Sequence, residues 1–201
     1  MRIYPIRTQR LLLRFPLMSD APTLVELLSE PSVSRNIPRI NYPYTRADAV
    51  KWLRRVRKPR FNASFGRGYD FMVEMAGEVV GCCHLSWNLK ERRAFFGYWV
   101  GKPYRGQGIA TEVARALVDF SFGRLGAERV WALAFADNLA SRQVLTKAGL
   151  KQEALLRRNA FFHRRWRDDA CYGALRGECL RISRARRQLP QKAHGWPSRV
   201  R

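Results

Sequence analysis

The sequence has few acidic residues, few cysteines and no long apolar run, and each shortage excludes a class of protein. No stretch approaches the roughly 20 apolar residues that a membrane-spanning helix needs, and the first residues lack the apolar segment of a secretory signal. We therefore expect a cytoplasmic protein. The four cysteines show no metal-ligand spacing, and Cys82 and Cys83 are neighbours in an expected strand. We interpret the cysteines as reduced structural thiols and expect no metal site.

The shortage of acidic residues leaves a strong positive charge. Asp and Glu number 16 against 38 Lys and Arg, so the 201-residue chain carries a formal net charge of +22 at pH 7. Such a charge attracts polyanions, among them nucleic acid, acidic protein surfaces and nucleotide cofactors. Charge alone does not choose among these, and a solvated basic surface without a dedicated partner explains it equally well. Hydrophobic residues make up 46% of the chain, which is enough for one sizeable core.

The first half of the chain predicts a helix-containing segment followed by an antiparallel meander. A short strand over 10–15 precedes a helix that begins after Asp20, and Thr45 with Asp48 three residues later predicts a capping box at the start of a second helix. Three strands follow, the first two joined at Gly77 by a tight turn. They are expected over 69–76, 78–87 and 94–100.

The second half alternates strands and helices, which predicts a parallel strand pair joined by a crossover helix. The expected elements are a helix over 108–125, a strand over 129–135, a helix over 140–148 and a closing hairpin over 152–157 and 169–175. The fold class is therefore α/β with a mixed (α+β) sheet. Beyond Gly177, arginines among Pro, Gln and Gly leave little to bury. We expect one domain over 1–177 and a basic, flexible tail over 178–201.

The strongest functional signal is the segment 104–110, Tyr-Arg-Gly-Gln-Gly-Ile-Ala, between an expected strand and an expected helix. Small residues there let the backbone turn tightly and direct free N–H groups, at the positive end of the helix dipole, into one concavity that suits a pyrophosphate. The segment is neither a Walker loop nor a dinucleotide fingerprint, because it lacks the following Lys-Ser or Lys-Thr and the three-glycine spacing. An ordinary strand-to-helix turn is the alternative.

The motif Arg105-x-x-Gly108-x-Ala110 resembles the Arg/Gln-x-x-Gly-x-Gly/Ala signature of the GNAT acetyltransferases, in which this loop holds the pyrophosphate of coenzyme A. The surrounding sequence is similar to the subgroup that includes ribosomal-protein N-terminal acetyltransferases. The similar segments are 8–14, 97–100, 110–112, 138–149 and 166–168. The resemblance implies a GNAT fold whose strand pair splays apart, acetyl-CoA as co-substrate, and transfer of the acetyl group to an amine.

The resemblance also implies roles for individual residues. Backbone groups of Tyr98 and Val100 would pair with the pantetheine arm in the manner of an added strand. Asn138 would hold the other side of that arm, and Ser141, one helical turn later, would lie near the thioester sulfur. An N-cap Asn and a surface Ser are the alternative for this pair. The expected cofactor-binding residues are Tyr98, Val100, Arg105, Gly106, Gln107, Gly108, Ile109, Ala110 and Asn138.

Two departures from the GNAT pattern affect the chemistry. The position at which many GNAT enzymes carry a Tyr acid is Leu145, which moves that role to Ser141 or to water. The position at which relatives often carry a Glu base is Phe95, so the base stays open. His84 and Glu74 lie on expected strands, but a lone His on a strand is more often structural. Ser141 is therefore the expected catalytic residue.

The expected function is transfer of an acetyl group from acetyl-CoA to a primary amine, with a protein or peptide N-terminus as the first candidate acceptor. A small-molecule amine such as an antibiotic or a polyamine is the alternative within the same chemistry. A non-catalytic RNA- or ribosome-binding protein on a GNAT fold is the alternative from another class, since the basic surface suits RNA. A monomer or homodimer without a membrane partner is expected.

Overall fold

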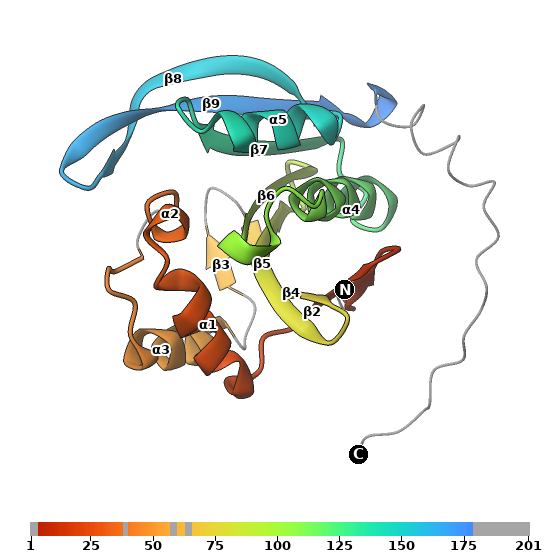
Figure 1. Cartoon of the computed structure of the whole chain (residues 1–201). Coiled ribbons are helices and arrows are strands. Elements are labelled where there is room, and N and C mark those ends of the chain that lie inside the picture. The colour runs from red at the N-terminus through yellow and green to blue at the C-terminus, as the bar shows by residue number, and fades with distance from the viewer. Residues whose placement is uncertain (1–3, 38–39, 57–59, 63–65, 179–201) are drawn as a thin grey trace, which may run out of the picture.

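The computed structural model describes residues 4–37, 40–56, 60–62 and 66–178, and the expected tail from 179 onward, Cys179 included, lies outside the described residues. One mixed sheet organises this part of the chain, in the strand order β1-β2-β4-β5-β6-β7-β9-β8, with β3 paired to β4 (Figure 1). The strands are β1 (Ile6–Arg7), β2 (Leu11–Arg14), β3 (Arg60–Asn62), β4 (Gly66–Met75), β5 (Glu78–Asn88), β6 (Arg93–Val100), β7 (Arg129–Phe135), β8 (Lys151–Phe162) and β9 (Arg165–Leu175).

Helices cover both faces of the sheet. They are α1 (Ala21–Leu28), α2 (Pro31–Ser34), α3 (Arg46–Val56), α4 (Ile109–Gly123) and α5 (Leu139–Lys147), with short 3-10 turns η1 (Met18–Asp20) and η2 (Lys102–Tyr104). Side chains alternate between the faces of β4. Phe71 and Val73 belong to a hydrophobic cluster shared with α4 and α5, whereas Met72 between them belongs to a cluster shared with α1 and α3. The sheet thus separates two apolar layers.

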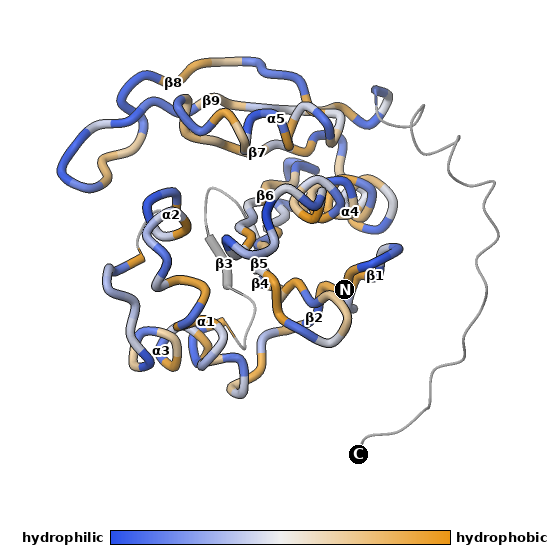
Figure 2. Tube along the Cα trace, viewed as in Figure 1, coloured by the Kyte–Doolittle hydropathy of each residue, from blue (hydrophilic) through white to orange (hydrophobic). Residues whose placement is uncertain are grey.

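The central strands are buried on both faces. The residues from Val79 to Cys83 in β5 are all buried, which explains why the sequence there is a continuous apolar run rather than an alternation. Figure 2 shows the same hydrophobic character in the strands at the centre of the molecule. The three expected strands of the antiparallel meander are confirmed as β4, β5 and β6, each paired antiparallel with the next.

Local predictions at helix and turn boundaries are also confirmed. Thr45 Oγ1 accepts a hydrogen bond from the backbone N–H of Asp48, and the Asp48 carboxylate accepts one from the Thr45 N–H, which is the expected capping box before α3. Gly77 has φ +86° in the turn between β4 and β5. The closing hairpin β8–β9 is longer than predicted, because bulges and positive-φ residues break the two-residue alternation of β8.

The parallel pair β6–β7 positions the site. Pairing between the two strands is limited to Arg93↔Arg129, Ala94↔Val130 and Phe95↔Trp131. Beyond Phe95 the two strands part, while β6 remains paired to β5 on its other side as far as Val100. The splay expected from the GNAT resemblance is therefore present, and the edge of β6 from Phe96 to Val100 has no strand pairing with β7.

Candidate functional site

A pocket of about 1160 Å³ opens where β6 and β7 part. It exceeds the roughly 300–1,000 Å³ typical of small-molecule sites. Its lining comes from both faces of the sheet: the start of α4 and part of α5 on one side, and α1, α2 and α3 on the other. We refer to these as the donor side and the acceptor side of the pocket.

The donor side contains the glycine loop expected to hold a phosphate group. Gly106 and Gly108 have φ of +78° and +77°, in the left-handed region that side-chain-bearing residues rarely adopt, and α4 begins at the next residue, Ile109. A Cβ added at Gly108 would meet only the Arg10 guanidinium, at 3.6 Å, so the φ angle rather than the space requires glycine there. The loop has the backbone conformation that an anion cradle at a helix N-terminus needs.

Two residues outside the motif anchor this loop. Arg10 donates to the Gln107 carbonyl oxygen at 3.1 Å and, through Nε, to the Glu112 carboxylate at 2.8 Å. Burial raises the pKa of Glu112, but hydrogen bonds from Thr8 and Arg10 outweigh that effect and hold the pKa below its usual value. As a carboxylate, Glu112 therefore fixes the turn between β1 and β2 to the first turn of α4. The role of Arg10 was not predicted, since the contact joins residues about one hundred positions apart.

The side chains of the motif face in different directions. Arg105 donates to the Val100 carbonyl at 3.3 Å and to the hydroxyl and carbonyl of Ser32 at 3.0 and 3.2 Å, so its guanidinium braces the loop against α2. The Gln107 amide donates to the Pro103 carbonyl, and Gln107 is not part of the pocket lining. The other expected cofactor-binding residues line the pocket, namely Tyr98, Val100, Arg105, Gly106, Gly108, Ile109, Ala110 and Asn138.

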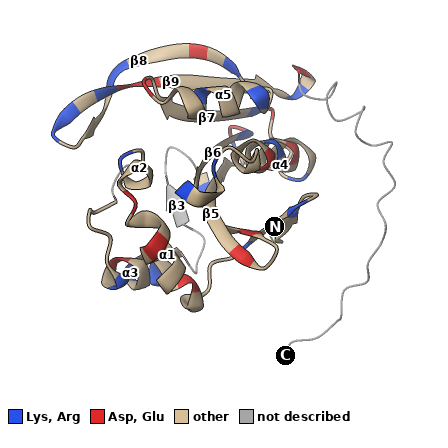
Figure 3. Ribbon diagram, viewed as in Figure 1, with Lys and Arg blue, Asp and Glu red and all other residues tan. Residues whose placement is uncertain are grey.

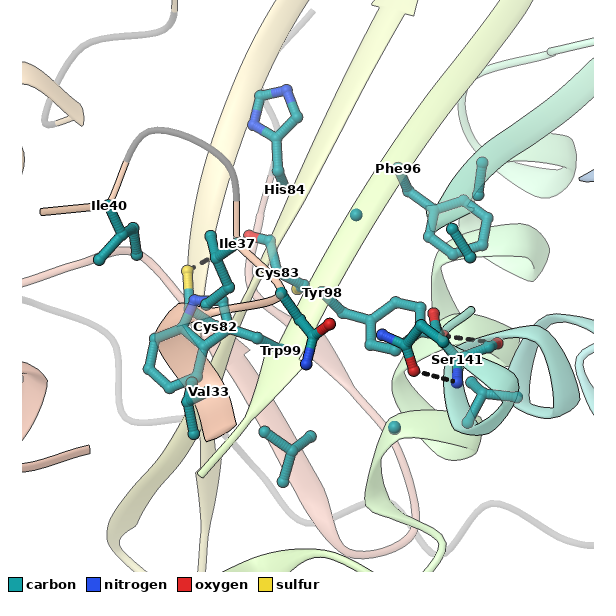
Figure 4. A pocket seen from close by; sticks show the side chains of 18 of the residues that line it. Val33, Ile37, Ile40, Cys82, Cys83, His84, Phe96, Tyr98, Trp99 and Ser141 are labelled. Carbon is teal, nitrogen blue, oxygen red and sulfur yellow. Dashed lines mark hydrogen bonds between the residues drawn. The ribbon is translucent and has the colours of Figure 1, made fainter. Parts of the chain in front are cut away.

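Two hydroxyl groups meet at the centre of the pocket (Figure 4). Tyr98 Oη lies 3.0 Å from Ser141 Oγ and 3.2 Å from the Ser141 carbonyl oxygen. A carbonyl only accepts, so the Tyr98 hydroxyl donates to it, and the Ser141 hydroxyl is then able to donate to the Tyr98 oxygen. Burial raises the pKa of Tyr98 to about 12, against the lowering effect of the Ser141 hydrogen bond. Tyr98 therefore keeps its proton at physiological pH.

The Asn138 side chain caps α5. Its Oδ1 accepts from the Ser141 backbone N–H at 3.1 Å, which is the N-cap geometry named as the alternative for this residue. Ser141 itself is half-buried and lines the pocket, so it is not a plain surface serine. Leu145, where many relatives carry a tyrosine, is 1% exposed and packs in the core. Sequence reasoning gave Tyr98 only a backbone role. In the structure its side-chain hydroxyl, and not one at position 145, lies beside Ser141.

The acceptor side is lined by apolar and charged side chains. Its apolar wall is formed by Leu24, Leu28, Val33, Ile37, Ile40, Tyr44, Trp52 and Trp99. Lys51 and Arg55 of α3 line the same side. Of the two candidate bases, Glu74 does not line the pocket and accepts from Arg14 Nε at 2.6 Å, whereas His84 does line it.

His84 has a carboxylate partner. Its Nδ1 lies 3.1 Å from Asp70 Oδ1 on the neighbouring strand β4, and both residues line the pocket. Figure 4 shows the imidazole projecting from β5 beyond Cys82 and Cys83. No disulfide joins Cys82, Cys83 or Cys171, the cysteines that the structure describes. Among the described residues there is no cluster of three or more His, Cys, Asp or Glu that could hold a metal ion, and no described helix is long and apolar enough to span a membrane.

Sequence comparison matches residues 10–151 to a family model described as Acetyltransferase (GNAT) domain. The Uncharacterized N-acetyltransferase p20 of Bacillus licheniformis is 28% identical over 153 residues, which cover 75% of this chain and 84% of that protein. The Probable N-acetyltransferase YjcK of Bacillus subtilis (strain 168) is 40% identical over 75 residues, and that match spans 37% of this chain and only 41% of the relative. Spermidine N(1)-acetyltransferase of Escherichia coli (strain K12) is 28% identical over 99 residues, 49% of this chain and 53% of that enzyme.

Solved structures share the fold. An acetyltransferase (GNAT family) from Bacillus anthracis superimposes with a TM-score of 0.74 at 24% identity, over 87% of this chain and 100% of that one. RimL, a ribosomal L7/L12 alpha-N-protein acetyltransferase solved in complex with coenzyme A, gives a TM-score of 0.74 at 19% identity, over 86% of this chain and 98% of that one. At these identities the likeness concerns the fold.

Proposed function

The chain belongs to the GNAT acetyltransferase family and is an N-acetyltransferase, and we propose that it takes the acetyl group from acetyl-CoA and transfers it to a peptide or protein N-terminus. The observation that carries the proposal is the junction of three features in one pocket. The unpaired edge of β6, the left-handed glycines before α4 and the hydroxyls of Tyr98 and Ser141 all line it. RimL, which shares the fold, is itself a coenzyme A complex.

On the donor side, each part of the proposed co-substrate has groups that would bind it. The loop around Gly106 and Gly108 would hold the pyrophosphate through backbone N–H groups at the start of α4. The free edge of β6 near Tyr98 and Val100 would pair with the pantetheine amides as an added strand does. Arg105 and Lys147 bring positive charge to the pocket, which favours an anionic ligand.

The reaction joins the amine nitrogen to the acetyl carbon, breaks the carbon–sulfur bond and leaves a thiol. Ser141 would hydrogen-bond to the sulfur as negative charge develops on it. An aliphatic hydroxyl is a much weaker acid than a thiol, so Ser141 stabilises the thiolate rather than protonating it fully, and the last proton comes from solvent. Burial keeps the Tyr98 hydroxyl protonated, so with the co-substrate bound it would donate to Ser141 Oγ and leave the Ser141 hydrogen for the sulfur. Tyr98 is thus a positioning residue for Ser141.

The apolar wall of the acceptor side favours a peptide N-terminus over a polyamine. Charge does not choose between the two acceptors, because Lys51 and Arg55 line the pocket together with the carboxylates of Asp48, Asp70 and Asp169. The apolar wall that includes Val33, Ile37 and Trp52 suits the side chain next to an α-amine. The similarity to spermidine N(1)-acetyltransferase makes the polyamine the comparison to test.

An acceptor screen with thiol detection tests the proposal. Peptides with different N-terminal residues, spermidine and an aminoglycoside are each incubated with acetyl-CoA, and released thiol and acetylated product are measured. We expect peptides with an apolar N-terminal residue to give the highest kcat/KM. Preference for spermidine would overturn the proposed acceptor, and absence of thiol release with every amine would leave a binding protein instead of an enzyme.

Contact with a polyanion such as RNA is a second proposal, supported by the hairpin β8–β9. Four arginines are exposed on this hairpin, namely Arg157, Arg158, Arg164 and Arg165, and Figure 3 shows basic residues there in blue. The exposed rings of Phe161 and Trp166 on the same hairpin have centroids 5.2 Å apart. Exposed aromatic rings beside arginines are suited to stacking on bases and neutralising phosphates. Salt-dependent binding of single-stranded RNA, reduced by Trp166→Ala, would support this role. RNA and reduced cysteines both fit the cytoplasm, where we propose that the enzyme acts.

A further inference from the structure

The attacking amine must lose a proton. The position at which relatives often carry the base holds no basic side chain in this protein. That position is Phe95, whose ring packs against Trp131 on β7 with 4.7 Å between the ring centroids. A phenyl ring has no lone pair and cannot accept the proton. The acceptor side therefore needs another group with a basic lone pair, and the histidine on the adjacent strand provides one.

His84 lies beside the splayed part of β6. It is paired in register with Gly97, two residues after Phe95, and residues paired across adjacent strands point to the same face of a sheet. A side chain at Gly97 would meet nothing within 4 Å, so the space over this point of the sheet is open. The His84 side chain is 29% exposed and lines the pocket. The imidazole is therefore reachable from the pocket.

Asp70 determines which ring nitrogen is basic. Its carboxylate is 9% exposed and lies 3.1 Å from His84 Nδ1. An ionised carboxylate only accepts hydrogen bonds, so Nδ1 carries the hydrogen and the lone pair lies on Nε2. This carboxylate–imidazole pair is the arrangement that fixes the tautomer and orientation of a general base and stabilises the imidazolium once it forms.

Gly68 provides the space for the ring. A Cβ added at Gly68 would come within 2.6 Å of His84 Cε1 and 3.0 Å of Nε2, so any side chain at this position would displace the imidazole. The φ of Gly68 is not in the left-handed region, so an alanine there meets no backbone strain. The absence of a side chain at Gly68 thus leaves room for the ring in its observed position.

We propose that His84 is the general base for the acceptor amine, through Nε2 directly or through one water, and that Asp70 is its positioning residue. The inference rests on the proposed acetyl transfer. As the nitrogen–carbon bond forms and the carbon–sulfur bond breaks, a proton leaves the amine nitrogen for Nε2, and the imidazolium then releases it to solvent. The net reaction consumes one neutral amine and yields one amide and one thiol.

The pocket that His84 lines has further charged residues besides Asp70 on β4. They are Asp48, Lys51 and Arg55 on α3, Arg105 before α4, Lys147 on α5 and Asp169 on β9. The pocket-lining residues of α1, α2 and β6 carry no charge. The carboxylate of Asp70 is the group in direct contact with the imidazole, so its removal should alter the tautomer and orientation of the ring more than any other single substitution.

The test uses a hexapeptide with a free α-amine as acceptor and measures kcat/KM from pH 5.5 to 9.5, with the acetyl-CoA-induced rise in melting temperature as a separate readout. His84→Gln should lower kcat/KM at pH 7 by about 100-fold, the lower end of general-base effects, and change the shape of the pH profile of kcat/KM. The rise in melting temperature should be unchanged. His163→Gln is the matched control, because His163 is exposed in the β8–β9 turn outside the pocket.

Two further variants separate catalysis from structure. Asp70→Asn should lower kcat while KM for the peptide stays nearly unchanged, because the imidazolium that forms during the reaction loses its counter-charge. Gly68→Ala should reproduce the loss of kcat/KM without removing a titratable group. A His84→Gln enzyme with wild-type kcat/KM and pH profile would refute the base while leaving the acetyltransferase intact. If the wild-type enzyme acetylates no amine at any pH, both the proposed function and the proposed base are refuted.

Discussion

The donor and acceptor sides of the pocket differ in whether backbone or side-chain groups line them. The donor side is mainly backbone: two left-handed glycines, the first turn of α4 and the edge of β6 that has no strand pairing with β7. The acceptor side is mainly side chains, which come from α1, α2, α3 and the strand pair β4–β5. A backbone site suits a ligand that never changes, whereas a wall of side chains is free to change with the acceptor. The contrast explains why the family motif identifies the donor and leaves the acceptor open.

The largest expected effect is on the donor side. Gly108→Val places a β-branched residue where φ is +77°, a conformation that such residues avoid at a cost of roughly 1–3 kcal/mol. The loop should rearrange and the acetyl-CoA-induced rise in melting temperature should disappear, with affinity reduced at least about 100-fold, which is roughly 2.7 kcal/mol of binding free energy. Differential scanning fluorimetry with saturating acetyl-CoA measures this.

Gly123→Val is the matched control for that experiment. Gly123 is exposed at the end of α4, its φ is not in the left-handed region, and a Cβ there would meet nothing within 4 Å. The control should retain the full cofactor response. If Gly108→Val retained it as well, backbone conformation would not be what defines the donor side, and the contrast between the two sides would be lost.

The second effect concerns the point at which the two sides meet. Ser141→Ala removes the hydroxyl 3.0 Å from Tyr98 Oη and should lower kcat by about 10- to 100-fold while the acetyl-CoA affinity stays within twofold, because the lost hydrogen bond forms mainly as the thiolate departs. Tyr98→Phe should lower kcat less. Steady-state kinetics with calorimetric cofactor titration separate the two parameters.

Ser29→Ala, which removes an exposed hydroxyl bonded to the Val25 carbonyl, is the control for the loss of a serine outside the pocket. Weaker cofactor binding with unchanged kcat in Ser141→Ala would make Ser141 a pantetheine contact on the donor side, without a part in the chemistry.

The same contrast decides how much could be predicted from the sequence. The Gly106–Gly108 loop was predictable because its conformation depends on neighbouring residues and on a strand-to-helix order visible in the periodicity. The capping box at Thr45 was predictable for the same reason. The Tyr98–Ser141 contact was not, since it joins residues 43 positions apart on different elements. Alternation places a residue on one face of a strand but does not say what covers that face.

His84 is a residue that the sequence showed but whose carboxylate partner it did not predict. Its type and its strand were visible in the sequence, yet its partner depends on the register of β4 against β5, which pairs Asp70 with His84. One residue of slip would move the carboxylate to the opposite face of the sheet. Register is a property of the folded sheet, so a histidine on a strand cannot be told from a catalytic dyad before the strands are paired.

The third effect is confined to the acceptor side. Trp52→Ala removes a half-buried ring from the apolar wall and should raise KM for an apolar N-terminal peptide by about tenfold, equivalent to roughly 1.4 kcal/mol, with cofactor affinity unchanged. Trp166→Ala, at an exposed ring of the β8–β9 hairpin, is the control and should leave KM unchanged. An equal rise in KM for spermidine and for the peptide would show that the wall does not select the acceptor.

The smallest expected effect comes from removing residues 179–201. The segment is rich in arginine and poor in apolar residues, so it has little to bury against either side of the pocket.

The shortened chain should end at Glu178, because the Glu178 carboxylate accepts hydrogen bonds from Lys151 Nζ at 2.5 Å and from the Leu175 N–H at 3.1 Å. Its melting temperature should stay within about 2 °C of the full chain, which corresponds to about 0.5–1 kcal/mol for a domain of this size, and peptide turnover should be unchanged. RNA affinity should fall and its dependence on salt should become shallower, because each lost phosphate contact removes one released counterion. Failure of the shortened chain to fold would show that the tail packs on the domain, and unchanged RNA binding would assign the polyanion contact to the described residues alone.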